Sequence, residues 1–90
     1  MQSQPITNGI DAVMKFCNDF RSKKTVSYYA KACEFIQKYY HQQQQVNYNA
    51  DINEQIRHGL QLETSDNQTS KYNRERYIFR VLGMLDDYYR

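Results

Sequence analysis

The chain has 90 residues, a length that accommodates one domain at most. Its 12 Lys and Arg residues against 10 Asp and Glu give a net charge of +2, and this near balance does not by itself indicate a nucleic-acid partner. We find no apolar run of 18 residues and no signal sequence, so we expect a cytoplasmic protein without a membrane partner. Only three Gly and one Pro interrupt the chain, which favours long helices over strands and turns.

The first predicted helix begins near residue 9. Residues 1–8 are polar and include a proline, so we expect a flexible N-terminus followed by a folded domain over 9–90. Asn8 is a suitable N-cap, and the helix should end near Ser22. Its apolar residues recur with the spacing of one helix face: Ile10, Val13, Met14, Cys17 and Phe20.

The second predicted helix runs from a cap at Thr25 to about His41. Its inward face has helical spacing and consists of Val26, Tyr29, Ala30, Cys33, Ile36 and Tyr40. The glutamines that follow are expected to continue or fray this helix. Cys33 in this helix and Cys17 in the first are best interpreted as reduced, buried apolar residues, because two cysteines do not make a disulfide framework.

Two further helices are predicted in the second half of the chain. A short one follows Asp51 and Glu54, which form a capping-box-like pair, and it should bury Ile52, Ile56 and Leu60. Residues 63–70 lack large apolar side chains and predict a loop. The last helix starts near Ser70, and its apolar stripe is Tyr77, Ile78, Val81, Leu82 and Leu85. Because it reaches the last residue without a stop signal, we expect the chain to be a fragment of a longer protein.

Positive charge is concentrated at the starts of two of these helices. Residues 21–38 carry five Lys and Arg against one Glu, and residues 71–80 carry four against one, so the remainder is acidic. Helix N-termini offer unpaired backbone N–H groups and a dipole that favours anions. The distribution predicts a face that presents two helix N-termini to an anion, and the phosphate backbone is the natural candidate.

The candidate DNA-binding residues form two clusters. Lys and Arg supply charge, while Ser, Thr and Asn side chains fix the register on phosphates. An ordinary solvated helix surface is the alternative interpretation of each residue taken alone, and the pairing of the clusters favours binding. The first cluster is Lys23, Lys24, Thr25, Ser27, Tyr28 and Lys31, and the second is Lys71, Asn73 and Arg74.

The sequence gives little basis for catalysis or for a cofactor. His41 and His58 are the only histidines and lie in no motif. No group of Cys, His or carboxylate residues has the spacing of a zinc site, and the three glycines are isolated rather than arranged as a phosphate-binding loop. We therefore predict no catalytic residue, no metal, no cofactor and no small-molecule substrate.

In its helix order and in the basic clusters described above, the chain resembles the N-terminal core-binding, SAM-like domain of tyrosine recombinases of the phage-integrase type. The resemblance covers residues 9–90. It rests on the order of helices and on a few positions. The chain departs from the family pattern at Cys33 and Ile36, where Leu and Phe are commoner, and at Gly83, which falls inside the last helix. The matching positions are Lys24, Thr25, Tyr29, Cys33 and Ile36 in the second helix, Asp51-Ile52 in the third, and Asn73-Arg74 with the stripe Ile78, Val81, Leu82 and Leu85 in the fourth.

The resemblance implies an all-α, compact four-helix bundle that clamps one side of a recombination site on double-stranded DNA. It also implies contacts with neighbouring protomers of a recombination complex. The catalytic tyrosine, Arg and His residues of such enzymes lie in a C-terminal domain, so this domain would bind DNA, in integration or recombination of a mobile element, without cleaving it.

A helical protein–protein interaction module is the alternative hypothesis. It is motivated by the near-neutral net charge and by the nine Tyr and three Met residues, since these residue types favour contact surfaces.

Overall fold

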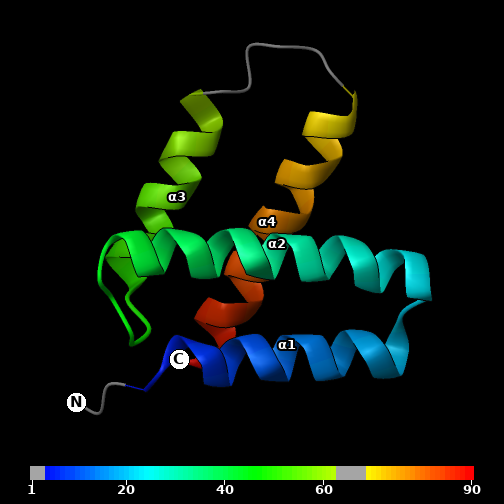
Figure 1. Cartoon of the computed structure of the whole chain (residues 1–90), viewed down its shortest axis with the longest axis horizontal. Helices are drawn as coiled ribbons and strands as arrows, with labels where there is room; N and C mark the ends of the chain where they lie inside the picture. Colours follow the sequence, from blue (N-terminus) through cyan, green and yellow to red (C-terminus); the bar gives the residue numbers. More distant parts are fainter. Residues whose placement is uncertain (1–3, 63–68) are drawn as a thin grey trace.

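The computed structural model describes the backbone of residues 4–62 and 69–90, and the side chains of 4–60 and 74–90. Within these ranges the chain forms four helices, α1 (Ile6–Phe20), α2 (Lys23–Gln42), α3 (Ala50–Leu62) and α4 (Thr69–Tyr88), and the one extended pairing is an isolated bridge between Pro5 and Asn47 (Figure 1). The prediction of a compact, all-α, four-helix domain is confirmed. The expected loop at 63–70 lies largely outside the described residues, and its last two residues already belong to α4.

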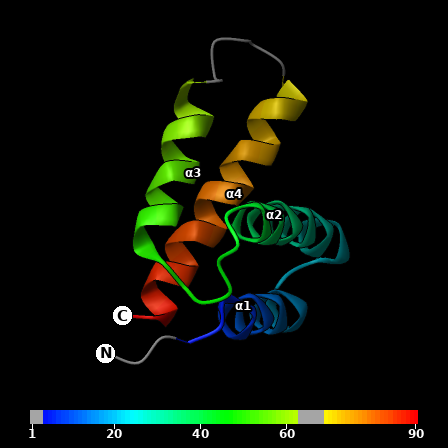
Figure 2. The same cartoon turned by 60° about the vertical axis from the view of Figure 1, so that its left-hand side comes forward.

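The four helices form two antiparallel pairs that cross each other. Figure 2 shows α1 and α2 nearly end-on, while α3 and α4 run lengthwise in the same view. Helix α4 packs against all three other helices, and its interface with α2 is the most extensive. The crossing of α4 over α2 therefore organises both the core and the surface beside it.

The core is built from the apolar stripes that the helical spacing predicts. All four helices contribute, and the fully buried centre is where α2 meets α4: Ile36, Ile78, Val81, Leu82 and Leu85 are each 0% exposed. Two residues predicted to face inward do not. Phe20 ends α1 and is 71% exposed, and Ala30 is exposed on α2, where Ala32 is the buried alanine, 1% exposed. Both cysteines are free and buried, as expected. Burial, reinforced by the neighbouring Cys17 thiol, raises the pKa of Cys33 to about 12, so this thiol stays protonated and unreactive.

Helix α1 begins earlier than the sequence suggested. The N-cap is Pro5 rather than Asn8: its φ of −57° is the value that the proline ring imposes, its ψ of 140° is extended, and no side chain caps the helix there. Ile6 then starts the helix and is 4% exposed in the core, and its N–H donates to the Val46 carbonyl at 2.9 Å. Asn8 consequently lies in the first turn, which is helical rather than part of a flexible end.

Two other caps also differ from the prediction. Ser22 rather than Thr25 caps α2: its Oγ accepts a hydrogen bond from the Thr25 N–H at 3.3 Å. Asn49 takes the role expected of Asp51 at α3, because its Oδ1 accepts from the N–H groups of Asp51 at 2.9 Å and Ile52 at 3.2 Å. Ser and Asn compete equally well for such positions, so sequence alone places a cap only to within a few residues.

We expect Ser22→Ala to destabilise the domain by about 1 kcal/mol, the usual cost of removing an N-cap side chain. Urea unfolding followed by circular dichroism measures the change. Ser27→Ala is the matched control, because Ser27 is an exposed serine inside the same helix and its loss should change stability by less than about 0.5 kcal/mol. Equal effects of the two substitutions would contradict the capping role.

A polar network centred on Asp86 lies between α2, α3 and α4. One carboxylate oxygen accepts from the Tyr48 hydroxyl at 2.7 Å and from Asn53 Nδ2 at 2.9 Å, and the other accepts from Arg57 at 2.5 Å. Asn53 is 0% exposed, and its Oδ1 accepts from the Tyr40 hydroxyl at 2.6 Å. Each polar group brought into this network is thus paired, which fixes how α3 sits on α4.

The ring of Tyr89 fastens the beginning of α1 to the end of α4. Its hydroxyl accepts from the Gly9 N–H at 2.8 Å and donates to the carbonyl of Pro5, so it is inserted where a backbone bond of the first helical turn would otherwise form. Tyr48 stacks on the same ring with centroids 4.4 Å apart. We call Gly9, Pro5, Tyr48 and Tyr89 the terminal clamp.

Candidate nucleic-acid interface

The first turns of α2 present most of the predicted cluster to solvent. Lys23, Lys24, Ser27 and Lys31 are exposed. Lys24, Ser27 and Lys31 follow a spacing of three and four residues and therefore share one face of the helix. Thr25 is partly buried, and its Oγ1 accepts from the Ser22 hydroxyl at 3.1 Å, so it belongs to the cap as well as to the cluster.

Two tyrosines join this cluster to α4. Tyr28, on the same face as Lys24, stacks on Tyr77 of α4 with ring centroids 5.2 Å apart. The Tyr77 ring also meets Tyr29 edge-on at 5.1 Å. Arg74 lies three residues before Tyr77 on α4 and is exposed, so the stack brings its helix face beside that of the α2 lysines. We call Lys24, Ser27, Tyr28, Lys31, Tyr77 and Arg74 the basic face.

The two basic clusters meet along the sides of their helices rather than at two adjacent N-termini. Tyr77 lies eight residues into α4, about 12 Å from its start at 1.5 Å per residue. The first turns of α4 extend beyond α2 (Figure 1). The side chains of Lys71 and Asn73 lie outside the described residues, so Arg74 is the member of the second cluster that the structure places.

Charge on the basic face is uncompensated. Among the side chains that the structure describes, Lys23, Lys24, Lys31 and Arg74 form no ion pair, whereas Lys38 pairs with Glu34 at 3.4 Å. The first turn of α2 also contains no acidic residue. Lysines there oppose the helix dipole and cost stability, and a bound anion would offset that cost.

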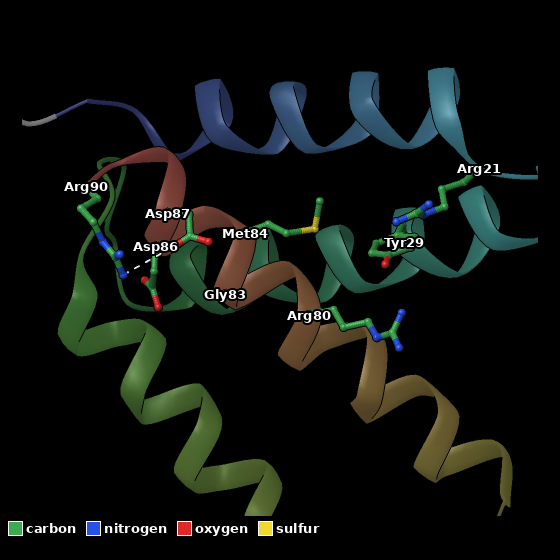
Figure 3. A pocket seen from close by; sticks show the side chains of 8 residues that line it. All are labelled: Arg21, Tyr29, Arg80, Gly83, Met84, Asp86, Asp87 and Arg90. Atoms are coloured by element: carbon green, nitrogen blue, oxygen red, sulfur yellow. Dashed lines mark ion pairs between the residues drawn. The ribbon is translucent and has the colours of Figure 1, made fainter.

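A groove lies beside the basic face, between the end of α1 and the second half of α4 (Figure 3). This open pocket of ≈ 570 Å³ has Arg21 and Arg80 around Tyr29 at one end, Gly83 and Met84 in the middle, and Asp87 paired with Arg90 at the other. Arg21 and Arg80 are functional candidates that the sequence reasoning missed. Both belong to the basic segments, and the three-residue spacing of Arg80 from Tyr77 was a usable signal.

Aromatic rings position both of these arginines. The Arg21 guanidinium carbon lies 5.4 Å from the ring centroid of Phe16, and that of Arg80 lies 5.8 Å from the centroid of Tyr77. The neighbouring Tyr29 hydroxyl raises the pKa of Arg80 further above its usual range. Arg80 is therefore a cation at neutral pH, as arginine side chains generally are.

Within residues 4–62 and 69–90, no three His, Cys, Asp or Glu side chains gather as metal ligands would. The helices in this part of the chain are too short or too polar to cross a membrane. Comparison of the sequence with protein-family models and curated proteins, and of the structure with solved structures, gave no match.

Proposed function

We propose that this domain binds double-stranded DNA through the basic face of α2 and α4. The observation that carries the proposal is the Tyr28–Tyr77 stack, which unites unpaired cations from two helices far apart in sequence into one surface. Cations that attract no carboxylate partner are free to neutralise phosphates, and Ser27 adds a hydroxyl that can fix the register.

We further propose that the domain serves as the SAM-like core-binding domain of a tyrosine recombinase. The resemblance of the sequence supports this assignment, and four helices are what such a domain requires. In that role the domain would clamp the recombination site and contact neighbouring protomers, and the chemistry would reside elsewhere in the protein.

The proposal predicts that Lys24→Ala combined with Arg74→Ala weakens duplex binding for every sequence tested. The slope of log K against log salt should fall by about 0.9 for each phosphate that the protein no longer neutralises. Fluorescence anisotropy with a labelled duplex at several salt concentrations measures both quantities.

Lys38→Ala is the matched control for this experiment. It removes one positive charge from the same helix, but that charge is already paired with Glu34 at 3.4 Å. Lys38 also lies ten residues beyond Tyr28 along α2, about 15 Å at 1.5 Å per residue. We expect binding by this variant to stay within about twofold of the wild type. Unchanged binding by the double variant, or an equal loss with Lys38→Ala, would refute the basic face as the DNA-binding surface.

The described apolar surface gives less support to a protein–protein interaction module. Phe20 and Val46 are the most exposed large apolar residues, each 71% exposed. Phe20 is the last residue of α1, whereas the Val46 carbonyl accepts a hydrogen bond from the N–H of Ile6, the first residue of α1. The 15-residue length of α1 therefore separates Phe20 from Val46 by roughly 20 Å. They therefore do not combine into one docking patch.

A further inference from the structure

We propose that Arg21 and Arg80, together with the Tyr29 hydroxyl, form a binding site for a single phosphate group at the basic end of the groove between α1 and α4. This site lies on residues outside the basic face. It deepens the proposed function, because a phosphodiester of DNA bound on the basic face is the ligand that the site fits best. Its phosphate chemistry can also be tested without DNA.

The guanidinium groups of Arg21 and Arg80 keep hydrogen-bond donors for a ligand, although one Arg80 donor is directed at the Tyr29 hydroxyl. Each is packed beside an aromatic ring, at 5.4 Å from Phe16 and 5.8 Å from Tyr77. A cation–π contact of this kind uses none of the in-plane N–H donors of an arginine, which has five. Both side chains are restrained by these rings, so less conformational entropy is lost when they bind an anion.

The charge balance along the groove selects one end for the anion. Asp86 is neutralised by Arg57, and Asp87 by Arg90 at 3.4 Å. Arg21 and Arg80 have no carboxylate partner among the described side chains. The unpaired positive charge therefore lies at the end formed by Arg21 and Arg80, and this is where a phosphate group would bind.

Gly83 lies in the wall of the groove, at its middle. A Cβ placed on this residue would meet no atom within 4 Å, so packing does not require glycine there. Glycine inside a helix costs about 1 kcal/mol relative to alanine. Its place in the wall of the groove lets a ligand approach the backbone of α4 closely.

The first test uses inorganic phosphate alone. Titration of the wild-type chain should shift the side-chain Nε–Hε resonances of Arg21 and Arg80 in NMR spectra. Arg21→Gln or Arg80→Gln should abolish the shift at the remaining arginine. Arg90→Gln removes the same charge from the far end of the same groove, where both members of its ion pair are over 70% exposed, and should leave the response intact.

The second test measures duplex DNA binding by the same three variants. Arg21→Gln and Arg80→Gln should each weaken binding about tenfold, as expected for a charge-assisted hydrogen bond, and Arg90→Gln should not. A phosphate response with no DNA binding by the wild type would support the site and overturn the proposed function. No arginine shift with phosphate, or equal losses in all three variants, would overturn the site.

Discussion

Replacing Gly9 with alanine is expected to destabilise the domain by about 2 kcal/mol, even though alanine is the better helix former. A Cβ at this position would lie 2.6 Å from Cε2 of Tyr89 and 2.8 Å from Cδ2 of Leu85. Leu85 is fully buried, and the Tyr89 hydroxyl is held by two backbone groups of α1, so neither side chain can move without loss. The added methyl would therefore separate α1 from α4.

The other two glycines are matched controls for Gly9→Ala. Gly59 in α3 and Gly83 in α4 also lie inside helices, and a Cβ at either would meet nothing within 4 Å. Each substitution to alanine should therefore stabilise the domain by up to about 1 kcal/mol. Urea unfolding of the three variants should give one loss and two gains, and stabilisation by Gly9→Ala would contradict the close contact of α1 with α4.

Replacing Asp86 with alanine should destabilise the domain by about 3 kcal/mol. The carboxylate accepts hydrogen bonds from Tyr48, Asn53 and Arg57, and its removal leaves the buried Asn53 amide without this acceptor. It also takes from the half-buried Arg57 one of its two carboxylate partners, the other being Glu54 at 2.6 Å. Asp87→Ala is the control, because the neighbouring Asp87 pairs with Arg90 at the exposed surface and its loss should cost less than about 0.5 kcal/mol. Similar losses in the two variants would refute the network.

The same carboxylate gives stability a pH dependence of known sign. Burial opposes ionisation of Asp86, but hydrogen bonds from Arg57, Tyr48 and Asn53 outweigh it, and the pKa lies below its usual value. Because the folded pKa is the lower one, this contribution is fully present above the unfolded pKa of about 3.9. It is lost as the pH falls through the folded value. Urea unfolding between pH 6 and 2 should show a smaller loss of stability in Asp86→Ala than in the wild type.

The sequence predicted the helices and the core well, because burial imposes a periodic pattern. The inward positions of α2 and α4, among them Ile36 and Leu82, follow directly from the 3.6-residue repeat. Caps were less predictable. Ser22 and Thr25 are both suitable N-caps. Which of the two caps α2 depends on where the chain leaves α1, and the local sequence does not indicate that position.

The long-range polar contacts could not be predicted from the sequence. Asp86 lies near the end of the last helix, and it accepts hydrogen bonds from residues 29, 33 and 38 positions earlier in the chain, a separation that no local pattern indicates. The same limit applies to the candidate site. Clustering of charge identified Lys24 and Arg74, but only the crossing of α4 over α2 brings Arg80 and Arg21 to one groove.

The terminal clamp has a consequence for the order of folding. The bond between the N–H of residue 9 and the hydroxyl of residue 89 closes a loop of 80 residues, and the entropic cost of such a closure is met only when intervening contacts exist. Helices α1 and α2, by contrast, follow each other directly in the chain, so the contacts between them close only short loops. The clamp therefore belongs to the last stage of assembly, and changes in it should act mainly by accelerating unfolding, with little effect on the folding rate.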